Sequence, residues 1–312
     1  MTATALPSQR TAARSKPGAL GAVKKIFFPV SPTYLFMIIP AIVLFTFFII
    51  YPAVVGMFYS FTNYVGYGDW HFVGLANYKA AFSDPTIRDS YGFTLLFAVV
   101  ACIVTNVVAM GLALALNAKI KWRAGFRTVF FMPLVISGLV ISYVFTFILS
   151  NSVPIIASAI HFAPLESSIL ANQHTAWLGI VFVASWVAIP GAIIIFLAGL
   201  VSIPTEVYEA ASIDGASAWK QFQKMTFPLL FPFFVINTIL TFKAFLSVYD
   251  ITVGLTNGGP GTATTSVSMT IFSGFFNGDY AYQMANAVIF FLITLLFAIF
   301  QLGVIRRQGG LL

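Results

Sequence analysis

Six apolar stretches, each of about 20 residues or more, constrain the fold of this chain more than any other feature. A transmembrane helix needs about 20 apolar residues, and such stretches run over residues 33–58, 91–116, 126–149, 176–201, 229–255 and 282–305. An isolated lipid-facing strand would leave its backbone polar groups unsatisfied, and the alternating pattern of a membrane barrel is absent. The sequence therefore predicts an all-α, polytopic membrane helix bundle with six transmembrane helices.

The composition agrees with a lipid environment. Hydrophobic residues make up 59% of the chain and charged residues 8%, against roughly 25% charged residues in soluble domains. Residues 1–30 are a polar tail without the layout of a signal peptide, because the first apolar stretch is long enough to span and no small-residue cleavage site ends it. We therefore expect a cytoplasmic N-terminal tail at 1–30 and a six-span domain at 31–312.

The charges between the stretches predict the orientation of the bundle. Of the 16 Lys and Arg residues, 13 flank the same side: Arg10, Arg14, Lys16, Lys24, Lys25, Lys119, Lys121, Arg123, Arg127, Lys220, Lys224, Arg306 and Arg307. The loops on the other side hold Lys79 and Arg88 together with five acids, Asp69, Asp84, Asp89, Glu166 and Asp279. By the positive-inside rule, both termini face the cytoplasm. The net charge of +7 thus reflects topology and not nucleic-acid binding, because no base-stacking aromatic series accompanies the divided basic residues.

The loop after the fourth stretch is a polar island between two apolar segments. Pro204 favours a helical φ near a helix start, and Glu206 lies in the first turn, where the helix dipole favours an anion. Gly215 can end that helix in a left-handed conformation. A second short helix can run over residues 217–225 before Pro228 begins the next stretch. The pattern predicts a helix, a glycine turn and a helix.

This loop resembles the cytoplasmic coupling motif of bacterial ABC importer permeases. The family pattern is Glu-Ala-Ala, three residues, Gly, nine residues, Ile, one residue, Leu-Pro, and it matches Glu209, Ala210, Ala211, Gly215, Met225, Phe227 and Pro228. Met225 and Phe227 replace Ile and Leu with other bulky apolar residues. The resemblance implies that this coupling loop, residues 202–228, docks on an ATPase subunit. Glu209 and Asp214 would offer carboxylates to partner donors, and Ala210 and Ala211 would let a partner backbone come close. The alternative is an amphipathic loop lying on the membrane surface.

Further segments are similar to carbohydrate importer permeases of the maltose and glycerol-3-phosphate type. They are residues 72–78, residues 126–128 before Met132-Pro133, and residues 249–264, which include Asn257, Gly258, Gly259 and Pro260. The Leu-Thr-Asn-Gly-Gly-Pro form resembles the first of the two permeases in such systems. The four residues from Asn257 to Pro260 also predict a tight extracytoplasmic turn. This turn is either a plain connection or a rigid loop against a binding protein or above the pathway.

The resemblance implies a set of partners and a location. The expected partners are a second homologous permease, two ATP-binding subunits that hold ATP and Mg, an extracytoplasmic substrate-binding protein and a carbohydrate substrate. The expected location is the bacterial plasma (inner) membrane, where the chain would be multi-pass. No cofactor is expected on the chain itself.

Catalytic and metal-binding patterns are missing from the sequence. There is no Gly-Lys dipeptide and hence no Walker A loop, and no nucleophile elbow appears. His71, His161 and His174 fall in predicted extracytoplasmic loops without Glu or Cys at ligand spacing. Cys102 is the single cysteine and lies within the second stretch, where we expect a packed core residue. The sequence therefore predicts a transport subunit without catalytic residues or a metal site.

Polar and aromatic residues within the apolar stretches are the candidates for a substrate pathway: Asn106, Trp186, Asn237, Lys243, Tyr249 and Asp250. Lys243, near the middle of the fifth stretch, would cost about 2.5–3.5 kcal/mol facing lipid and should face the interior, a partner or water. Asp250 follows seven residues later, on the same face of a continuous helix and about 10 Å along its axis. Substrate contact and an ion pair with another chain stay open for both residues.

The remaining candidates have a structural and a functional interpretation each. Trp186 precedes a break expected at Pro190-Gly191, and its ring suits core packing first and stacking on a sugar second. Asn106 and Asn237 suit interhelical hydrogen bonds first and recognition of sugar hydroxyls second.

The predicted function is import of a sugar or sugar derivative by ATP-driven alternating access. The alternative is a secondary transporter or channel driven by an ion gradient. That class needs an intramembrane ionisable relay or a repeat of broken helices, and the sequence offers only Lys243 and Asp250.

Overall fold

A computed structural model describes residues 32–118 and 121–308 of the 312-residue chain. The tail predicted at residues 1–30 lies outside the described residues. The described part consists of helices joined by loops, and its one β-type pairing is an isolated antiparallel bridge between Thr62 and Phe72. The α-helices are α2 Pro32–Phe45, α3 Tyr51–Tyr59, α4 Ala76–Ser83, α5 Pro85–Asn117, α6 Arg123–Phe131, α7 Gly138–Phe147, α8 Val153–Ala159, α9 Ala176–Ser202, α10 Thr205–Ile213, α11 Ala218–Gln221, α12 Phe227–Leu246, α13 Asp250–Thr256, α14 Val267–Phe276 and α15 Tyr280–Gln308.

Six helical segments of the described chain are long and apolar enough to cross a membrane, which confirms the prediction of an all-α, six-span bundle. They are Phe36–Tyr59, Pro85–Asn117, Gly138–Ala159, Ala176–Ser202, Ala218–Leu246 and Tyr280–Gln301. The chain divides into two compact units, Met1–Val55 and Gly56–Leu312. The first unit contributes α2, a π-helical turn and the start of α3.

Within residues 32–118 and 121–308, three π-helical turns allow long helices to continue across prolines. Each turn is followed at the second position by a proline: Thr46–Ile50 by Pro52, Ile148–Ser152 by Pro154, and Phe222–Thr226 by Pro228. A proline cannot donate to the carbonyl four residues earlier. The residue before it donates instead to the carbonyl five residues back, as the Phe227 amide does to the Phe222 oxygen. The wider turn thus lets the helix continue past the proline.

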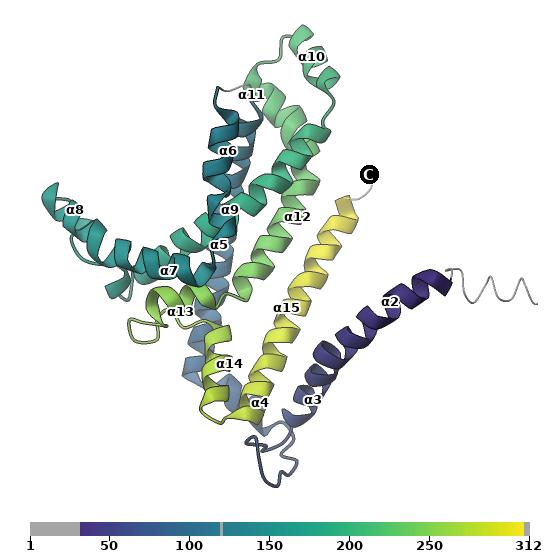
Figure 1. Ribbon diagram of the computed structural model, residues 1–312, viewed down its shortest axis with the longest axis vertical. Coiled ribbons are helices and arrows are strands. Elements are labelled where there is room, and N and C mark those ends of the chain that lie inside the picture. The colour runs from purple at the N-terminus through teal and green to yellow at the C-terminus, as the bar shows by residue number, and fades with distance from the viewer. Residues whose placement is uncertain (1–31, 119–120, 309–312) are drawn as a thin grey trace, which may run out of the picture. The chain divides into compact units, whose positions relative to one another are not determined.

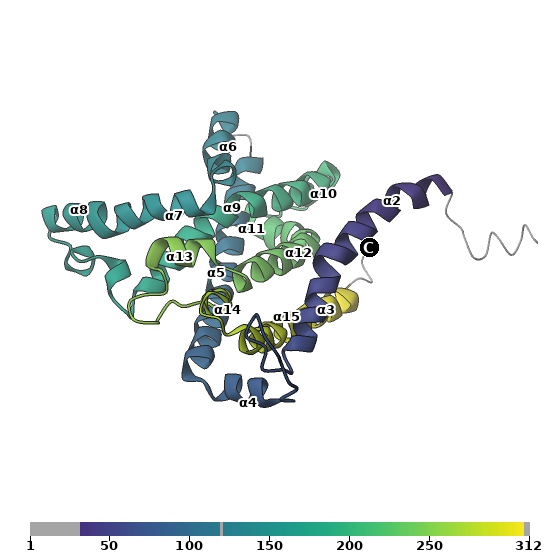
Figure 2. The same cartoon turned by 60° about the horizontal axis from the view of Figure 1, so that its bottom comes forward.

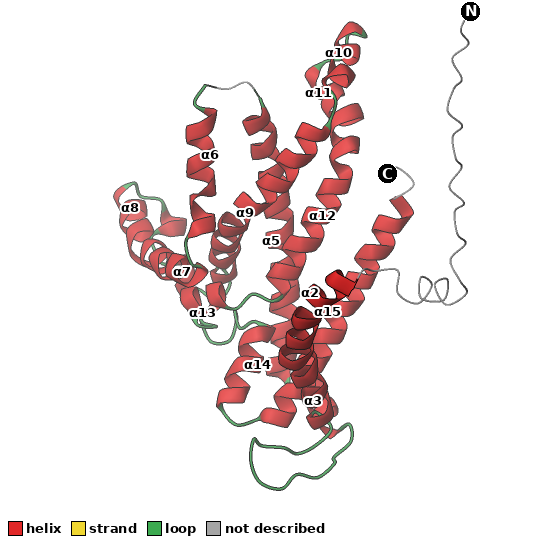
Figure 3. Ribbon diagram, turned by 45° about the vertical axis from the view of Figure 1, so that its right-hand side comes forward, coloured by secondary structure: helices red, strands yellow, loops and turns green. Residues whose placement is uncertain are grey.

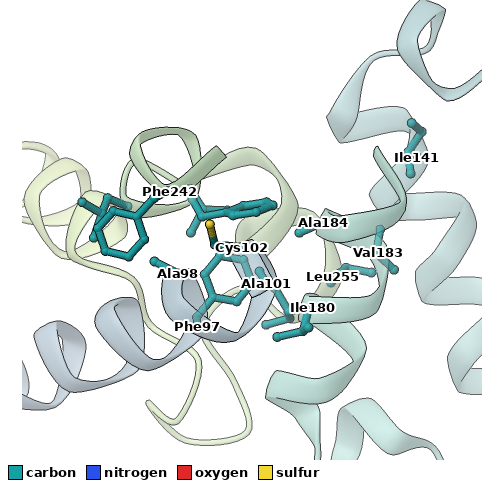
Figure 4. Packing of buried hydrophobic residues seen from close by; sticks show 14 of the residues in the cluster. Phe97, Ala98, Ala101, Cys102, Ile141, Ile180, Val183, Ala184, Phe242 and Leu255 are labelled. Carbon is teal, nitrogen blue, oxygen red and sulfur yellow. The ribbon is translucent and has the colours of Figure 1, made fainter. Parts of the chain in front are cut away.

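The core of the larger unit lies where α5 packs against α9 and α12. Figure 4 shows the α5 side chains Phe97, Ala101 and Cys102 close to Ile180 and Phe242. Cys102 is 5% exposed, so the expectation of a packed core residue is confirmed. A second apolar cluster continues along the same three helices and includes Leu116, Phe196 and Leu230.

The long helices of the larger unit end in two different groups of short helices. The helices α10 and α11 lie at one end of α5, α9 and α12, whereas α4 and α14 lie near the other end (Figures 1 and 3). The helices α7 and α8 project to the side of this bundle (Figure 2).

At the start of α5, Asp84 accepts hydrogen bonds from the Thr86 amide at 2.8 Å and the Tyr282 hydroxyl at 2.9 Å. Burial alone would raise the pKa of Asp84, but these hydrogen bonds outweigh it and hold the pKa below its usual value.

Two predicted spans have different boundaries in the structure. The third stretch, 126–149, is not one helix, because α6 ends at Phe131 and a 3₁₀ turn, Met132–Val135, separates it from α7. Pro133 explains this break, since it has no amide hydrogen to donate to the carbonyl four residues earlier. The fifth stretch, 229–255, also breaks, because α12 ends at Leu246 and α13 begins at Asp250.

The break expected at Pro190-Gly191 is absent from the structure. The helix α9 runs from Ala176 to Ser202 through Pro190, which is buried. Packing of α9 on both α5 and α12 explains why the helix continues, because tertiary contacts outweigh the local cost of one lost backbone hydrogen bond.

Candidate functional site

The coupling loop is ordered by its own hydrogen bonds. Pro204 is extended, with φ −60° and ψ 139°, and directly precedes α10, which carries Glu206 in its first turn. Gly215 has a φ of +72°, so the predicted left-handed turn is present. The Ala216 amide donates to the Ala211 oxygen at 2.9 Å and the Gly215 amide to the Ser212 oxygen at 3.1 Å. This pair of bonds is a Schellman motif, which satisfies carbonyl groups at the end of α10.

Side chains then connect α10 to the helix that follows. The Gln221 amide nitrogen donates to the Ala216 oxygen at 3.1 Å and to the Ser212 hydroxyl at 3.2 Å. The hydroxyls of Tyr208 and Thr226 share a hydrogen bond of 3.1 Å, which joins α10 to the base of α12. The coupling loop is therefore attached to the bundle at both of its ends and across its middle.

One face of α10 and its turn is exposed. Glu209, Ala210, Asp214 and Gly215 lie on this face, where a partner could reach them. Ala211 differs, because it is 1% exposed. It lies three residues after Tyr208 and thus on the inner face of α10. The expectation that Ala211 lets a partner backbone approach is therefore wrong.

The second half of the coupling loop is one continuous helix with the fifth span. Ser217 caps α11, and the helical path then runs from Ala218 to Leu246 without interruption. The prediction of a separate helix ending before Pro228 is therefore wrong, because the π-helical turn before Pro228 accommodates the proline. Met225 is partly exposed. The ring of Phe227 packs against two aromatic rings of its own chain, with a centroid distance of 6.1 Å to both Phe222 and Phe231.

Two exposed apolar residues of the coupling loop were missed by the sequence interpretation. Ile213 is 87% exposed and lies beside Asp214 at the end of α10. Trp219 is 65% exposed and stacks on Phe222 with a centroid distance of 5.5 Å. The sequence does contain a signal for this exposed residue, because Ile213 is an apolar residue between Ser212 and Asp214 in an otherwise polar turn. Both side chains leave apolar surface exposed at this end of the bundle.

The buried amides join helices in the core. The Asn106 amide nitrogen donates to the Thr241 hydroxyl at 3.0 Å, which links α5 to α12. The Asn237 amide nitrogen donates to the Ala192 oxygen at 2.9 Å, which links α12 to α9. Both asparagines are 1% exposed. Both side chains therefore make interhelical hydrogen bonds inside the core.

Lys243 and Asp250 flank the break between α12 and α13. Both are exposed, and within the described chain neither side chain has a hydrogen-bond or ion-pair partner. Lys243 lies in the last turn of α12 and Asp250 in the first turn of α13, the ends at which the helix dipoles favour these charges. The expectation that they share one helix face is wrong, because the helix is interrupted. Lys243 is also close to the end of the fifth span and not at its middle.

The aromatic candidates pack against other rings. Trp186 is half-buried and lies 5.2 Å from the Phe145 ring. Tyr249, in the break between α12 and α13, lies 4.8 Å from the Phe272 ring. The rings of Trp186 and Tyr249 are thus partly exposed and partly packed against other aromatic side chains.

The predicted turn at residues 257–260 is present and closes on itself. Asn257 and Gly258 have φ values of 47° and 85°, the left-handed geometry for which these residue types are suited. The Thr264 amide donates to the Gly258 oxygen at 3.1 Å, and the Thr256 and Thr264 hydroxyls share a bond of 2.7 Å. Thr264 is fully buried, which makes the loop a compact unit after α13.

The six-span fold with a structured loop at one end defines a membrane-embedded transport subunit. Residues 107–309 match the family model described as "Binding-protein-dependent transport system inner membrane component". The chain belongs to this family, whose members are permeases of ABC importers.

Relatives extend over nearly the whole chain. It is 36% identical to the multiple sugar-binding transport system permease protein MsmF of Streptococcus mutans, over 87% of this chain and 94% of that protein. It is 32% identical to the probable starch degradation products transport system permease protein AmyD of Thermoanaerobacterium thermosulfurigenes, over 92% and 98%. These relatives are permease subunits and not ATPases.

Solved structures share the fold. A bacterial ABC transporter involved in the import of the acidic polysaccharide alginate superposes with a TM-score of 0.76 at 21% identity, covering 88% of this chain and 95% of that one. The same kind of transporter in complex with its pentasaccharide-bound periplasmic protein gives a TM-score of 0.77 at 20% identity, over 93% and 98%.

Proposed function

We propose that this chain is one of two homologous permease subunits in a binding-protein-dependent importer that moves a sugar or sugar derivative into the cell. The observation that carries this proposal is the coupling loop, whose Schellman turn holds exposed Glu209, Ile213 and Asp214 at one end of a six-span bundle. Relatives named for multiple sugars, starch degradation products and sn-glycerol-3-phosphate support a carbohydrate or sugar-phosphate substrate.

The driving force comes from partner subunits in this proposal. Two ATP-binding subunits hold ATP and Mg, and one of them docks on the exposed face of α10. Closure of those subunits would displace the coupling loop. Because the helix from Ala218 to Leu246 contains 29 residues, it forms a rod of about 43 Å that carries the displacement across the membrane.

The far end of this rod is the proposed position of the pathway entrance. At the end of α12 the Lys243 and Phe245 oxygens accept from the Ser247 and Val248 amides, at 3.4 and 3.3 Å. The first amides of α13 have no acceptor within their own helix, so water, a partner or a substrate can accept from them. Lys243, Tyr249 and Asp250 lie at this break and are the candidate contacts for sugar hydroxyls. Trp186 adds a ring that could stack on a sugar. Asn106 and Asn237 are assigned a supporting role, since their amides are used between helices.

Reconstituted transport tests the proposal. The purified complex, placed in vesicles with its binding protein, should accumulate a labelled sugar when ATP is supplied on the side of the ATPase subunits. No uptake should follow from an ion gradient alone. Uptake that persists without ATP and collapses with the gradient would instead identify a secondary transporter.

The orientation in the bacterial plasma membrane is a separate prediction. With both termini and the coupling loop in the cytoplasm, cysteine reporters at Ser217 and Lys121 in a Cys102→Ser background should be shielded from an impermeant thiol reagent outside the cell. Reporters at Ser83, Ser167 and Thr262 should react with it unless a partner covers them. Labelling of Ser217 from outside would overturn the orientation.

Lys243→Met is expected to change transport without preventing assembly. The substitution keeps an apolar stem and removes the charge at the end of α12, so uptake rate or sugar selectivity should change several-fold. If Lys243 instead neutralises a buried acid on the second permease, the heterodimer should lose several kcal/mol of stability. Assembly and uptake measured on one sample separate these outcomes, with Lys79→Met on α4 as the control for losing one cation. Unchanged assembly and uptake would remove Lys243 from the site.

A further inference from the structure

A hollow of about 430 Å³ lies beside the first turns of α5, away from the coupling loop. The hollow is lined by residues of α5, by Trp177 of α9 and by Ala263 of the closed loop after α13. The α5 residues are Arg88, Asp89, Gly92, Phe93 and Leu96. The helix α5 has 33 residues and is about 50 Å long, which exceeds the hydrocarbon thickness of about 30 Å. Because Arg88 and Asp89 would be costly in hydrocarbon, we place the first turns of α5 in the headgroup layer, where tryptophans such as Trp177 are commonly found.

The hollow contains one cation and one anion without partners. Arg88 and Asp89 are exposed, and within the described residues neither side chain makes a hydrogen bond or an ion pair. A guanidinium group binds phosphate oxygens through paired N–H groups, and a carboxylate accepts hydrogen bonds from an ammonium group. The two side chains together suit a ligand that carries a phosphate and a primary amine.

Gly92 leaves room that the chain itself does not use. It is an exposed residue inside α5, and a Cβ atom placed there would meet nothing within 4 Å. A glycine inside a helix costs about 0.5–1 kcal/mol relative to alanine. Because no packing within the chain requires this glycine, the space it leaves suits a molecule outside the chain.

An apolar strip continues from the hollow along α5. Leu96, Val99, Ile103 and Val107 follow at helical spacing and are 54%, 46%, 59% and 57% exposed. The strip from residue 96 to residue 107 is about 16 Å long, close to half of the hydrocarbon thickness of about 30 Å. Helix–helix contacts in membranes favour small residues, whereas this strip consists of branched side chains. An acyl chain therefore fits the strip better than a partner helix.

We infer that the hollow binds the headgroup of an aminophospholipid, phosphatidylethanolamine, whose acyl chain lies along the strip. Arg88 contacts the phosphate, Asp89 accepts from the ammonium group, and Gly92 provides the space between Trp177 and α5. This inference requires that the chain lies in a bilayer and does not depend on the transported substrate. Failure of sugar uptake would therefore leave it unaffected.

Lipid titration of the assembled complex tests the site. Delipidated complex is mixed with phosphatidylethanolamine, phosphatidylcholine or phosphatidylglycerol, and the bound lipid is counted by native mass spectrometry. The wild type should bind phosphatidylethanolamine most tightly. Arg88→Gln and Gly92→Leu should each weaken that binding about tenfold, the first by removing a charge-assisted bond and the second by filling the hollow. Asp89→Asn should remove the preference over phosphatidylglycerol, because the carboxylate also repels an anionic headgroup.

Gly111→Leu is the matched control. Gly111 is also exposed in α5, and a Cβ atom added there would likewise meet nothing within 4 Å, but it lies 19 residues further along the helix. The substitution should leave the binding of phosphatidylethanolamine unchanged. Equal binding of the three lipids by the wild type, or no effect of Gly92→Leu, would overturn the inference. Loss of heterodimer assembly or of binding-protein stimulation in Gly92→Leu, with lipid binding intact, would assign the hollow to a protein partner instead.

Discussion

Glu209→Lys is expected to reduce ATP-driven uptake by about a hundredfold while leaving membrane insertion intact. The exposed carboxylate of Glu209 lies on the face of α10 that we assign to the ATPase subunit, where the partner should present donors. A lysine would place like charges together, which costs several kcal/mol, and each 1.4 kcal/mol is a factor of ten in affinity. Uptake, ATPase stimulation by the binding protein and co-purification of the ATPase subunits measure the effect.

Glu206→Lys is the matched control for this change. Glu206 is exposed on the same helix, and its replacement changes the net charge equally. Glu206 lies three residues before Glu209, nearer the start of α10, where the helix dipole favours an acid by about 0.3–1 kcal/mol. We therefore expect a much smaller loss of uptake than with Glu209→Lys. Gly215→Val should behave like Glu209→Lys, because valine does not adopt the φ of +72° that closes the turn. Wild-type coupling in both Glu209→Lys and Gly215→Val would rule out docking through this loop.

Gly254→Ala is expected to destabilise the folded chain by about 1–3 kcal/mol. Gly254 lies in α13 against α7, and an added Cβ atom would overlap the Cβ of Ser142 and lie 3.1 Å from its hydroxyl oxygen. A Cβ atom cannot rotate away, so α7 and α13 must separate, and overpacking of this kind costs about 1–3 kcal/mol. The bonds from the Thr146 hydroxyl to the Gly254 and Leu255 oxygens, at 3.0 and 3.4 Å, should weaken as well. The thermal unfolding of the purified complex measures this loss.

Gly138→Ala provides the comparison on the same interface. A Cβ atom at Gly138 would lie 3.9 Å from the nearest atom of Ile251, an ordinary van der Waals distance. The melting temperature of Gly138→Ala should stay at or above that of the wild type, because alanine favours a helix more than glycine does. Equal stability of Gly254→Ala and Gly138→Ala would show that α7 and α13 are not held as closely as the structure indicates.

The number and type of the membrane spans were predictable from the sequence, since each needs only a long apolar stretch. The short α10 and its turn at Gly215 were predictable for a similar reason, because a glycine at a helix end and an acid in the first turn act locally. The exposed Ile213 was missed, because its exposure depends on which face of α10 packs against Tyr208 and Thr226.

The prolines show why local signals were not enough for span boundaries. Pro133 ends a helix, Pro190 does not, and Pro228 follows a π-helical turn inside a continuous helix. The same residue type thus has three outcomes. The difference comes from neighbouring helices, which can supply enough packing to outweigh one missing hydrogen bond.

By itself the sequence determined the six-span helical class, the family resemblance and the position of the coupling loop, because apolar length and motif spacing are properties of the chain alone. Only the tertiary structure decided that Ala211 faces inward, that Asn106 and Asn237 join helices, and that Lys243 and Asp250 flank a break. These outcomes depend on which surfaces α5, α9 and α12 present to one another. Burial and hydrogen-bond partners across a bundle arise from contacts between residues far apart in the chain, which no local pattern encodes.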